Sequence, residues 1–343
     1  MGFELAKILF GANAKVYLAG RSEKRVLEAI RLLRGECPSS KGDLVWLPLD
    51  LADLTSVKIA VDEFQSKENR LDVLWNNAGV MCTPVTAKSE QVTLSILCPA
   101  TLSLKLSSPL FISPGQGYDL QIGTNVLGPY LLTTLLYPIM RKTAETAPID
   151  SVRVCWASSI TIELSPRGGI EIDDSGSPIL SNTKYTNYFV SKAANNLLAS
   201  EFGKKCQQEN ILSVVSENQL PFLPCDNIVC LHTNTHSEQA FNPGNLDTGL
   251  TRYLTLPILG SIVPRLMSLV MWSPRYGAYT ELYAGLSPDL TIEKHTGAYI
   301  WPWGHVGYLR SDIENSLRTE NEGGSGKAAS LLAWCERETV AFT

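Results

Sequence analysis

Apolar positions recur along most of the chain with periods that alternate between those of strands and those of helices. Strands are predicted at Ala14–Ala19, Leu44–Leu49, Leu71–Trp75, Val152–Ala157 and Ile211–Val214. Helices are predicted at Phe3–Phe10, Glu23–Leu33, Leu54–Phe64, Val126–Arg141 and Tyr188–Cys206. The strands are almost continuously apolar, which is typical of a parallel sheet covered by helices on both faces. The pattern therefore predicts an α/β fold whose ligand site lies beyond the carboxyl ends of the strands.

The composition narrows the class of protein. A chain of 343 residues is long enough to bury a sizeable core. Hydrophobic residues make up 44% and charged residues 18%, which is typical of a globular protein. The formal net charge is −5 and no run of basic residues is present, so the sequence gives no indication of nucleic-acid binding.

The cysteines and one apolar stretch bear on the compartment. The eight cysteines include no CxxC pair, so we expect free thiols in a reducing compartment, the cytoplasm, and no metal site. The stretch Tyr253–Trp272 is long enough to span a membrane, but Pro257, Pro264 and Arg265 interrupt it. We expect a substrate-side segment over residues 251–275, and weak peripheral association of the apolar stretch 253–272 with a membrane stays an alternative.

Tyr188 and Lys192 are the first candidates for chemistry. Their spacing places both side chains on one face of a predicted helix, one turn apart. A free tyrosine has a pKa near 10, and a neighbouring ammonium favours the phenolate and lowers that pKa. The pair can therefore serve as an acid in carbonyl reduction and as a base in alcohol oxidation. Without context, this spacing more often marks a solvated helix face.

Other polar residues stand at the ends of predicted elements. Ser159 follows the strand Val152–Ala157, where its hydroxyl could bond a reacting oxygen, although a serine can also simply close a strand. Asn125 opens a long helix, where it could equally be an N-cap. Asn77 and the pair Pro243-Gly244 each follow a strand, and each has an alternative interpretation as an ordinary turn.

Taken in order, these motifs resemble the short-chain dehydrogenase/reductase family. The motifs are NNAG at 76–79, a helix-opening asparagine, a strand-ending serine pair, YFVSK at 188–192 and FNPGNLDTG at 241–249. The C-terminal GAYIWPWGHVGYLRSDI and EGGSGKAASLLAWCERE are similar to fungal, retinol-dehydrogenase-like members. The resemblance implies a Rossmann-like, doubly wound parallel sheet in three α/β/α layers, forming a single domain over residues 1–343.

The resemblance also implies roles for single residues. Tyr188 would donate or accept the proton, Ser159 would orient the substrate oxygen, and Asn125 would hold a water in the proton relay. Lys192 would bind the nicotinamide ribose and lower the tyrosine pKa. The residues implied in cofactor binding are Gly2, Arg21, Asp50, Asn77, Tyr188, Lys192, Leu246 and Thr248.

The choice between NADP and NAD is argued from Arg21. This residue stands at the end of the strand Ala14–Ala19, where an acidic residue would bind the ribose hydroxyls of NAD. An arginine suits the 2′-phosphate of NADP, and the first acidic residue, Glu23, comes two positions later. We therefore expect NADP as cofactor, with NAD as the alternative and a merely solvated arginine as the other interpretation of Arg21.

The sequence departs from the family pattern at its start. The family begins with a strand and a glycine-rich TGxxxGIG turn, and Gly2 matches the last glycine of that turn. That turn lets the pyrophosphate approach a helix N-terminus. We therefore expect a sheet that lacks its first strand, and we expect residues 1–343 alone to aggregate or to bind no cofactor.

Two stretches, Val92–Gln116 and Val215–Gln239, carry no clear period. Irregular segments of this length are unusual inside a compact domain. Without them the flanking residues join in the family pattern, as SEQ-GYDLQIGTN and as ILSV-AFNPGN. Each begins with valine and ends with glutamine, whose codons can supply the GT and AG borders of an intron. Our hypothesis is that both are retained introns, and genuine loops around the substrate entrance are the alternative.

The function expected from the sequence is interconversion of a carbonyl and an alcohol on a small lipophilic substrate, with NADP as hydride carrier. The apolar segment from residue 251 is consistent with a lipophilic pocket. The alternative is a catalytically inactive relative that binds or regulates, or a non-functional fragment. The sequence leaves homo-oligomerisation open.

The splicing hypothesis makes a prediction about the messenger RNA of this gene. We expect most messenger RNA from this gene to lack the codons of both stretches. Sequencing of full-length transcripts measures this directly. Transcripts that retain both stretches in most copies would contradict the hypothesis and favour genuine loops. The functional experiments below use the protein that this transcript encodes, with the residue numbers of the printed sequence.

Overall fold

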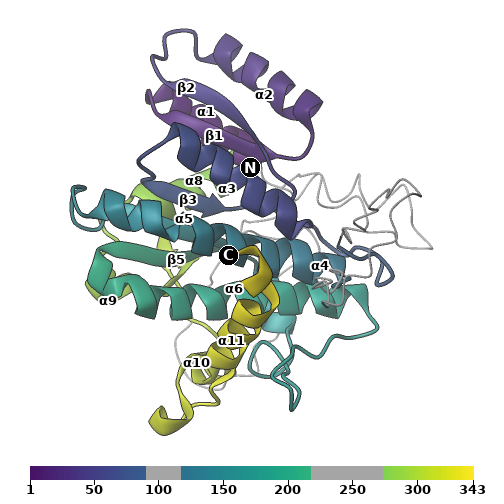
Figure 1. Cartoon of the computed structure of the whole chain (residues 1–343). Coiled ribbons are helices and arrows are strands. Elements are labelled where there is room, and N and C mark those ends of the chain that lie inside the picture. Colours follow the sequence, from purple (N-terminus) through teal and green to yellow (C-terminus); the bar gives the residue numbers. More distant parts are fainter. Residues whose placement is uncertain (90–116, 218–272) are drawn as a thin grey trace, which may run out of the picture.

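Strands and helices alternate through the computed structural model, which describes residues 1–89, 117–217 and 273–343 (Figure 1). The strands are β1 (Lys15–Gly20), β2 (Asp43–Pro48), β3 (Val73–Asn76), β4 (Val152–Ser158), β5 (Ile211–Glu217), β6 (Tyr299–Trp301) and β7 (His305–Val306). The longer helices are α1 (Gly2–Gly11), α2 (Glu23–Glu36), α3 (Leu54–Lys67), α5 (Gly128–Ala144), α6 (Lys184–Cys206), α8 (Pro274–Leu286) and α11 (Lys327–Thr339). Short helices are α4 (Leu120–Ile122), α9 (Ile292–His295) and α10 (Ser311–Leu317). Every strand and helix predicted from the periodicity is present.

The strands form two parallel groups. β1 pairs with β2 in parallel, with Tyr17 opposite Val45. The second group has the order β3-β4-β5-β6-β7, and only the short β7 runs antiparallel to its neighbour. Among the described residues no strand pairs with both β1 and β3, so the sheet is divided between them. The predicted fold class, an α/β fold with a parallel sheet, is confirmed.

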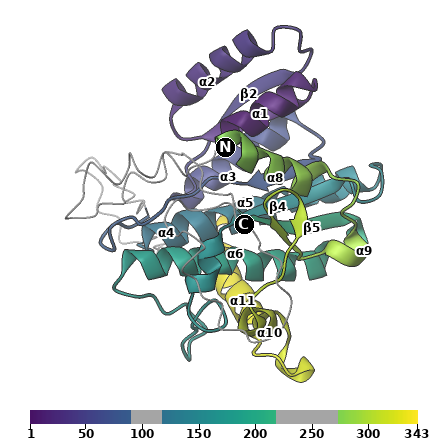
Figure 2. The same ribbon diagram turned by 180° about the vertical axis from the view of Figure 1, so that it is seen from behind.

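Helices cover both faces of the sheet. Helices α3, α5 and α6 lie in front of the strands in Figure 1, and Figure 2 shows α1 and α8 in front from the opposite side. The largest core cluster joins α3, α5, α6 and α11 to the inner faces of β4 and β5. Residues of β4 and β5 are almost fully buried, whereas Val73, Leu74 and Trp75 of β3, beside the divide, are only partly buried.

Strand β5 is longer than predicted. Val215, Ser216 and Glu217 continue it and pair with the last three residues of β4. The predicted end at Val214 was wrong by three residues, because the polar residues Ser216 and Glu217 interrupt the apolar run although both are buried. The first residues of the second irregular stretch therefore belong to the sheet.

Several predicted features lie outside the described residues. They are the first irregular stretch, the rest of the second, and the apolar stretch up to Trp272. The last residues of the predicted substrate-side segment lead into α8, for which Ser273 is the N-cap. No helix in the described ranges combines the length and the apolar character needed to cross a membrane. The cysteines in those ranges, Cys37, Cys82, Cys155, Cys206 and Cys335, are all free thiols, as predicted.

Gly128 lets α5 approach the loop after β2. A Cβ atom built on Gly128 would lie 2.3 Å from the backbone oxygen of Leu51, much closer than atoms can pack. Because backbone cannot move aside as a side chain can, Gly128→Ala should lower the free energy of unfolding by about 1–3 kcal/mol. Gly35→Ala is the control, because Gly35 lies in α2 with nothing within 4 Å of an added Cβ.

Thermal unfolding of both variants measures the difference. Gly35→Ala should leave the protein unchanged or stabilise it by up to about 1 kcal/mol, since alanine favours a helix over glycine. Equal melting temperatures for the two variants would show that α5 does not make this close approach.

Candidate active site

The predicted catalytic residues meet at the carboxyl end of β4. Ser159 follows the last residue of this strand, and α6 crosses the same edge with Tyr188 and Lys192 on its inner face. All three side chains are buried. Ser159 accepts a hydrogen bond from the backbone N–H of Thr161 at 3.3 Å, which makes it the N-cap of a 3-10 turn over Ile160–Leu164.

Tyr188 is enclosed by apolar side chains. It lies in a small buried cluster with Met81 and Cys82, against which Phe189 packs. Burial raises the pKa of the Tyr188 phenol above its usual value, the Cys82 thiol raises it further, and a hydrogen bond with Ser159 lowers it. The lowered tyrosine pKa that the helical spacing suggested is not found, because desolvation of the phenolate outweighs every favourable contact.

Lys192 is held against the strand end. Its Nζ donates a hydrogen bond to the backbone oxygen of Ala157 at 3.0 Å and lies 5.8 Å from the centre of the Tyr188 ring. Burial lowers the pKa of Lys192 to about 8, and the charge of Glu281 on α8 opposes that shift. The ammonium is therefore close to the phenol, as the sequence predicted, and with a pKa of about 8 it is still mostly protonated at pH 7.

Asn125 lies in a π-helical turn, Gly123–Leu127, which immediately precedes α5. Its Nδ2 donates to the backbone oxygen of Val80 at 2.8 Å and to the Ser191 hydroxyl at 3.0 Å. Its Oδ1 accepts the Val80 N–H at 2.8 Å. Both N–H groups of the amide are thus used within the protein, so the side chain fixes the backbone after NNAG and has no donor left for a relay water.

Steric crowding explains why the last residue of NNAG, Gly79, is a glycine. A Cβ atom on Gly79 would lie 2.8 Å from the Asn125 Oδ1 and 3.9 Å from the Lys192 Nζ. At the start of α1, a Cβ atom on Gly2 would lie 3.0 Å from the Nδ2 of Asn77. The structure thus brings together Gly2 and Asn77, two residues predicted to bind the cofactor.

Arg21 and Asp50 are also brought together. They follow β1 and β2, and Arg21 Nη1 lies 3.5 Å from Asp50 Oδ2. The Arg21 side chain is 64% exposed, so its guanidinium is accessible to a ligand. An exposed pair of this kind contributes little to stability. Leu246 and Thr248, and the Pro243-Gly244 turn, lie outside the described residues.

Sequence reasoning missed two residues of the site. The Ser158 hydroxyl donates to the backbone oxygen of Lys192 at 3.0 Å and accepts from Asn196 at 2.6 Å. Cys82 has a positive φ of 50° and lies beside Tyr188, where burial raises the pKa of its thiol to about 11. The serine doublet and the residues after NNAG were visible signals, but only the fold shows which atoms they contact.

Hydroxyl, phenol and ammonium groups that meet at the carboxyl edge of a parallel sheet fit the active site of a nicotinamide-dependent oxidoreductase, the class of protein that the sequence resemblance implies. The sequence profile described as "short chain dehydrogenase" matches residues 1–149. A short-chain dehydrogenase/reductase from Phomopsis amygdali is 37% identical, covering 100% of this chain and 87% of its own length. Another, bet4 from Neocamarosporium betae, is 34% identical and covers 100% of this chain and 84% of its own.

Solved structures agree on the fold. An uncharacterized protein from Mycobacterium paratuberculosis superposes with a TM-score of 0.56 at 21% identity, covering 99% of this chain and 89% of its own. RhlG of Pseudomonas aeruginosa, in an active-site complex with NADP, superposes with a TM-score of 0.52 at 19% identity. The match covers 88% of this chain and 90% of RhlG. The chain belongs to the short-chain dehydrogenase/reductase family, as the motifs predicted.

The buried ammonium of Lys192 should reduce stability at neutral pH. Its pKa is about 8 in the folded protein and near 10.5 when unfolded, so the unfolded chain binds more protons between these values. The cost is therefore fully present below pH 8 and disappears as the pH rises towards 10.5. Lys192→Met should raise the free energy of unfolding by roughly 1–3 kcal/mol at pH 7, and by less at pH 10.

Denaturant unfolding of cofactor-free protein at the two pH values measures this difference. Lys58→Met is the control, because Lys58 lies exposed on α3 and pairs with Asp62. A gain from Lys192→Met that is the same at both pH values would show that the ammonium is not the source of the cost.

Proposed function

We propose that the protein is an NADP-dependent oxidoreductase that interconverts a carbonyl and an alcohol on a small lipophilic substrate, with Tyr188 as the acid/base. The observation that carries this proposal is the convergence of Ser159, Tyr188 and Lys192 at the end of β4. Met81 and Cys82 make the surroundings of the phenol apolar, which suits a lipophilic substrate.

In the direction of reduction, NADPH, when bound, would be the source of the hydride for the carbonyl carbon. The Ser159 hydroxyl donates a hydrogen bond to the carbonyl oxygen, where negative charge develops. The Tyr188 phenol transfers its proton to that oxygen, which leaves a phenolate. The Lys192 ammonium stabilises this phenolate by its charge, and it does so more strongly where water is excluded. Oxidation of the alcohol reverses each transfer.

The residues present fit a nicotinamide cofactor. A Cβ atom on Gly2 would lie 3.0 Å from the Asn77 Nδ2, so the glycine lets the start of α1 lie against the NNAG turn, at the helix end where a phosphate of the cofactor would bind. Lys192 and Tyr188 would face the nicotinamide ribose, and Asp50 the adenine. Leu246 and Thr248 would contact the nicotinamide carboxamide, as the family resemblance implies.

The preference for NADP rests on Arg21. Its exposed guanidinium lies beyond the end of β1. A planar guanidinium can bind a phosphate through two parallel hydrogen bonds, in bidentate geometry. Asp50 beside it neutralises part of the charge and would orient the side chain. We also propose that residues 1–343 form one domain in the cytoplasm, with residues 251–275 on the substrate side.

One observation favours the second candidate, a catalytically inactive relative. Burial raises the Tyr188 pKa, and a phenol that rarely ionises is a poor base. The Tyr188→Phe variant decides between the two candidates, because it removes only the oxygen that transfers the proton. Turnover should fall by at least about 10²-fold. The measurement is NADPH oxidation with a panel of lipophilic aldehydes and ketones.

Tyr185→Phe is the matched control, since Tyr185 lies exposed on the same helix and should be replaceable without loss. Unchanged turnover in the Tyr188 variant would refute the proposed acid/base. A parent protein without turnover on any carbonyl in the panel would favour the inactive relative.

Arg21→Asp should weaken NADPH binding by about tenfold or more, because it places a carboxylate against the 2′-phosphate. Binding of NADH should be unchanged or tighter, since an acidic residue there accepts the ribose hydroxyls. Titration of tryptophan fluorescence with each cofactor gives both affinities. Arg25→Asp, an exposed change on α2, is the control. Equal affinities of the parent for NADPH and NADH would show that Arg21 is only a surface charge.

A further inference from the structure

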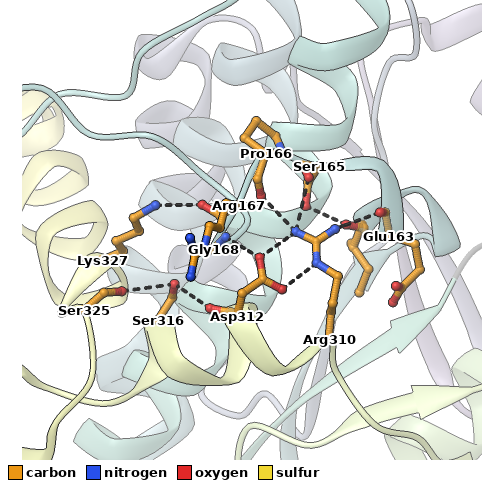
Figure 3. A network of polar contacts seen from close by, with 11 residues as sticks. Glu163, Ser165, Pro166, Arg167, Gly168, Arg310, Asp312, Ser316, Ser325 and Lys327 are labelled. Carbon is orange, nitrogen blue, oxygen red and sulfur yellow. Dashed lines mark hydrogen bonds and ion pairs between the residues drawn. The ribbon is translucent and has the colours of Figure 1, made fainter. Parts of the chain in front are cut away.

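The segment that follows Ser159 is bonded by several side chains of the C-terminal part of the chain, and Arg310 makes the most of these bonds (Figure 3). Arg310 is the N-cap of α10, far from Ser159 in sequence. Its Nη1 donates to the backbone oxygens of Ile162 at 3.2 Å and Glu163 at 2.7 Å. Its Nη2 donates to those of Ser165 at 3.2 Å and Pro166 at 2.9 Å. One guanidinium therefore bonds four backbone carbonyls of a single short segment.

Asp312 fixes the direction of that guanidinium. Its two carboxylate oxygens accept from Arg310 Nε at 2.5 Å and Nη2 at 2.8 Å. The same carboxylate accepts the backbone N–H of Gly168 at 2.5 Å, so it also holds the far end of the segment. The pairing with Arg310 lowers the pKa of Asp312 to about 2, which keeps the carboxylate charged at any ordinary pH.

The clamped segment begins at the proposed catalytic serine. Ile162, whose carbonyl Arg310 holds, donates its own N–H to the Ser159 backbone oxygen at 3.1 Å. Thr161 donates its N–H to the Ser159 hydroxyl at 3.3 Å. A 3-10 turn has poor hydrogen-bond geometry and leaves its last carbonyls without partners inside the turn. Arg310 bonds the Glu163 carbonyl and adds to the bonds that the Ile162 carbonyl already accepts from Ser165, and it thereby holds the turn that contains the Ser159 hydroxyl.

Only an arginine offers this pattern. The guanidinium presents five N–H groups in a rigid plane, and here they reach four carbonyls and one carboxylate. A lysine has three donors on one atom and cannot span that distance. The segment is also fitted closely at its end, because a Cβ atom on Gly168, whose φ is +79°, would lie 2.7 Å from the Ser316 hydroxyl. A displaced segment therefore has little room to settle elsewhere.

We propose that Arg310, oriented by Asp312, is a positioning residue that sets the Ser159 hydroxyl for the transition state. This proposal rests on the proposed function, in which Ser159 bonds the reacting oxygen. Arg310 does not act on the substrate. Loss of its guanidinium should therefore lower kcat and leave the affinity for the cofactor unchanged. A displacement of a catalytic group by about 1 Å can lower the rate by 10²-fold.

The first experiment compares Arg310→Lys with Arg337→Lys. Arg337 on α11 also clamps a loop, since it donates to the Ser175 backbone oxygen and the Ser177 hydroxyl, but this loop does not contain Ser159. Hydrogen exchange followed by mass spectrometry reports the peptide over residues 160–170. Exchange there should be about tenfold faster in Arg310→Lys, as expected for loss of charged hydrogen bonds, and unchanged in Arg337→Lys. Unchanged exchange in Arg310→Lys overturns the proposal without any need for turnover.

The second experiment measures kcat and KM for NADPH with phenanthrenequinone, a lipophilic dicarbonyl, as the probe. Arg310→Lys should lower kcat by about tenfold to 100-fold, with KM for NADPH unchanged. In the Ser159→Ala background the same change should have no further effect on kcat, because the group it positions is already gone. A merely structural clamp would lower the melting temperature and leave kcat per folded molecule unchanged, and this result overturns the proposal.

The two proposals fail in different ways. Full activity of Ser159→Ala or Tyr188→Phe would refute the proposed function. Loss of activity in both, with normal kcat in Arg310→Lys, would refute only the positioning role. An Arg310→Lys effect that persists in the Ser159→Ala background would show that Arg310 acts on some other group.

Discussion

The carbonyl of Ala157, one residue before the end of β4, is the point on which the site depends. Lys192 Nζ and Asn195 Nδ2 both donate to this oxygen, at 3.0 and 2.8 Å. In the next residue, the Ser158 hydroxyl donates to the Lys192 backbone oxygen at 3.0 Å. These bonds hold α6 across the strand end, and the buried ends of neighbouring parallel strands offer no water to replace them. Tyr188, one helical turn away, is placed by the same contacts.

Placing ionisable groups in this setting has an energetic cost. Burial raises the pKa of Tyr188 and lowers that of Lys192, so each group resists the charge that catalysis requires of it. A phenolate and an ammonium at this distance stabilise each other in a medium of low dielectric constant, so the two charges are best formed together. In this account, bonds within the protein hold the groups in place: Ser158 and Asn125 fix the backbone around them, and Arg310 holds the turn after Ser159.

Much of this fold and site could be predicted from the sequence, because apolar periodicity and motif order carry the information directly. The parallel sheet and the covering helices follow from the apolar periodicity. The meeting of Ser159 with Tyr188 follows from the order of two motifs, a strand that ends in two serines and then YFVSK. Other features could not be predicted. Burial of Ser216 and Glu217 depends on neighbours distant in sequence, and the clamp on the Ser159 turn joins residues far apart in the chain. The tyrosine pKa was predicted in the wrong direction because spacing shows a nearby charge but not the extent of desolvation.

The central claim is that Ser159, Tyr188 and Lys192 act as one unit. Measurement of kcat for the three single variants Ser159→Ala, Tyr188→Phe and Lys192→Met and for the triple variant tests it most directly. When groups cooperate in one proton transfer, removal of one of them already removes the rate enhancement that the others contribute. The triple variant should therefore be no more than about threefold slower than the slowest single variant. Rate losses that multiply across the three positions would show independent contributions and would contradict the account.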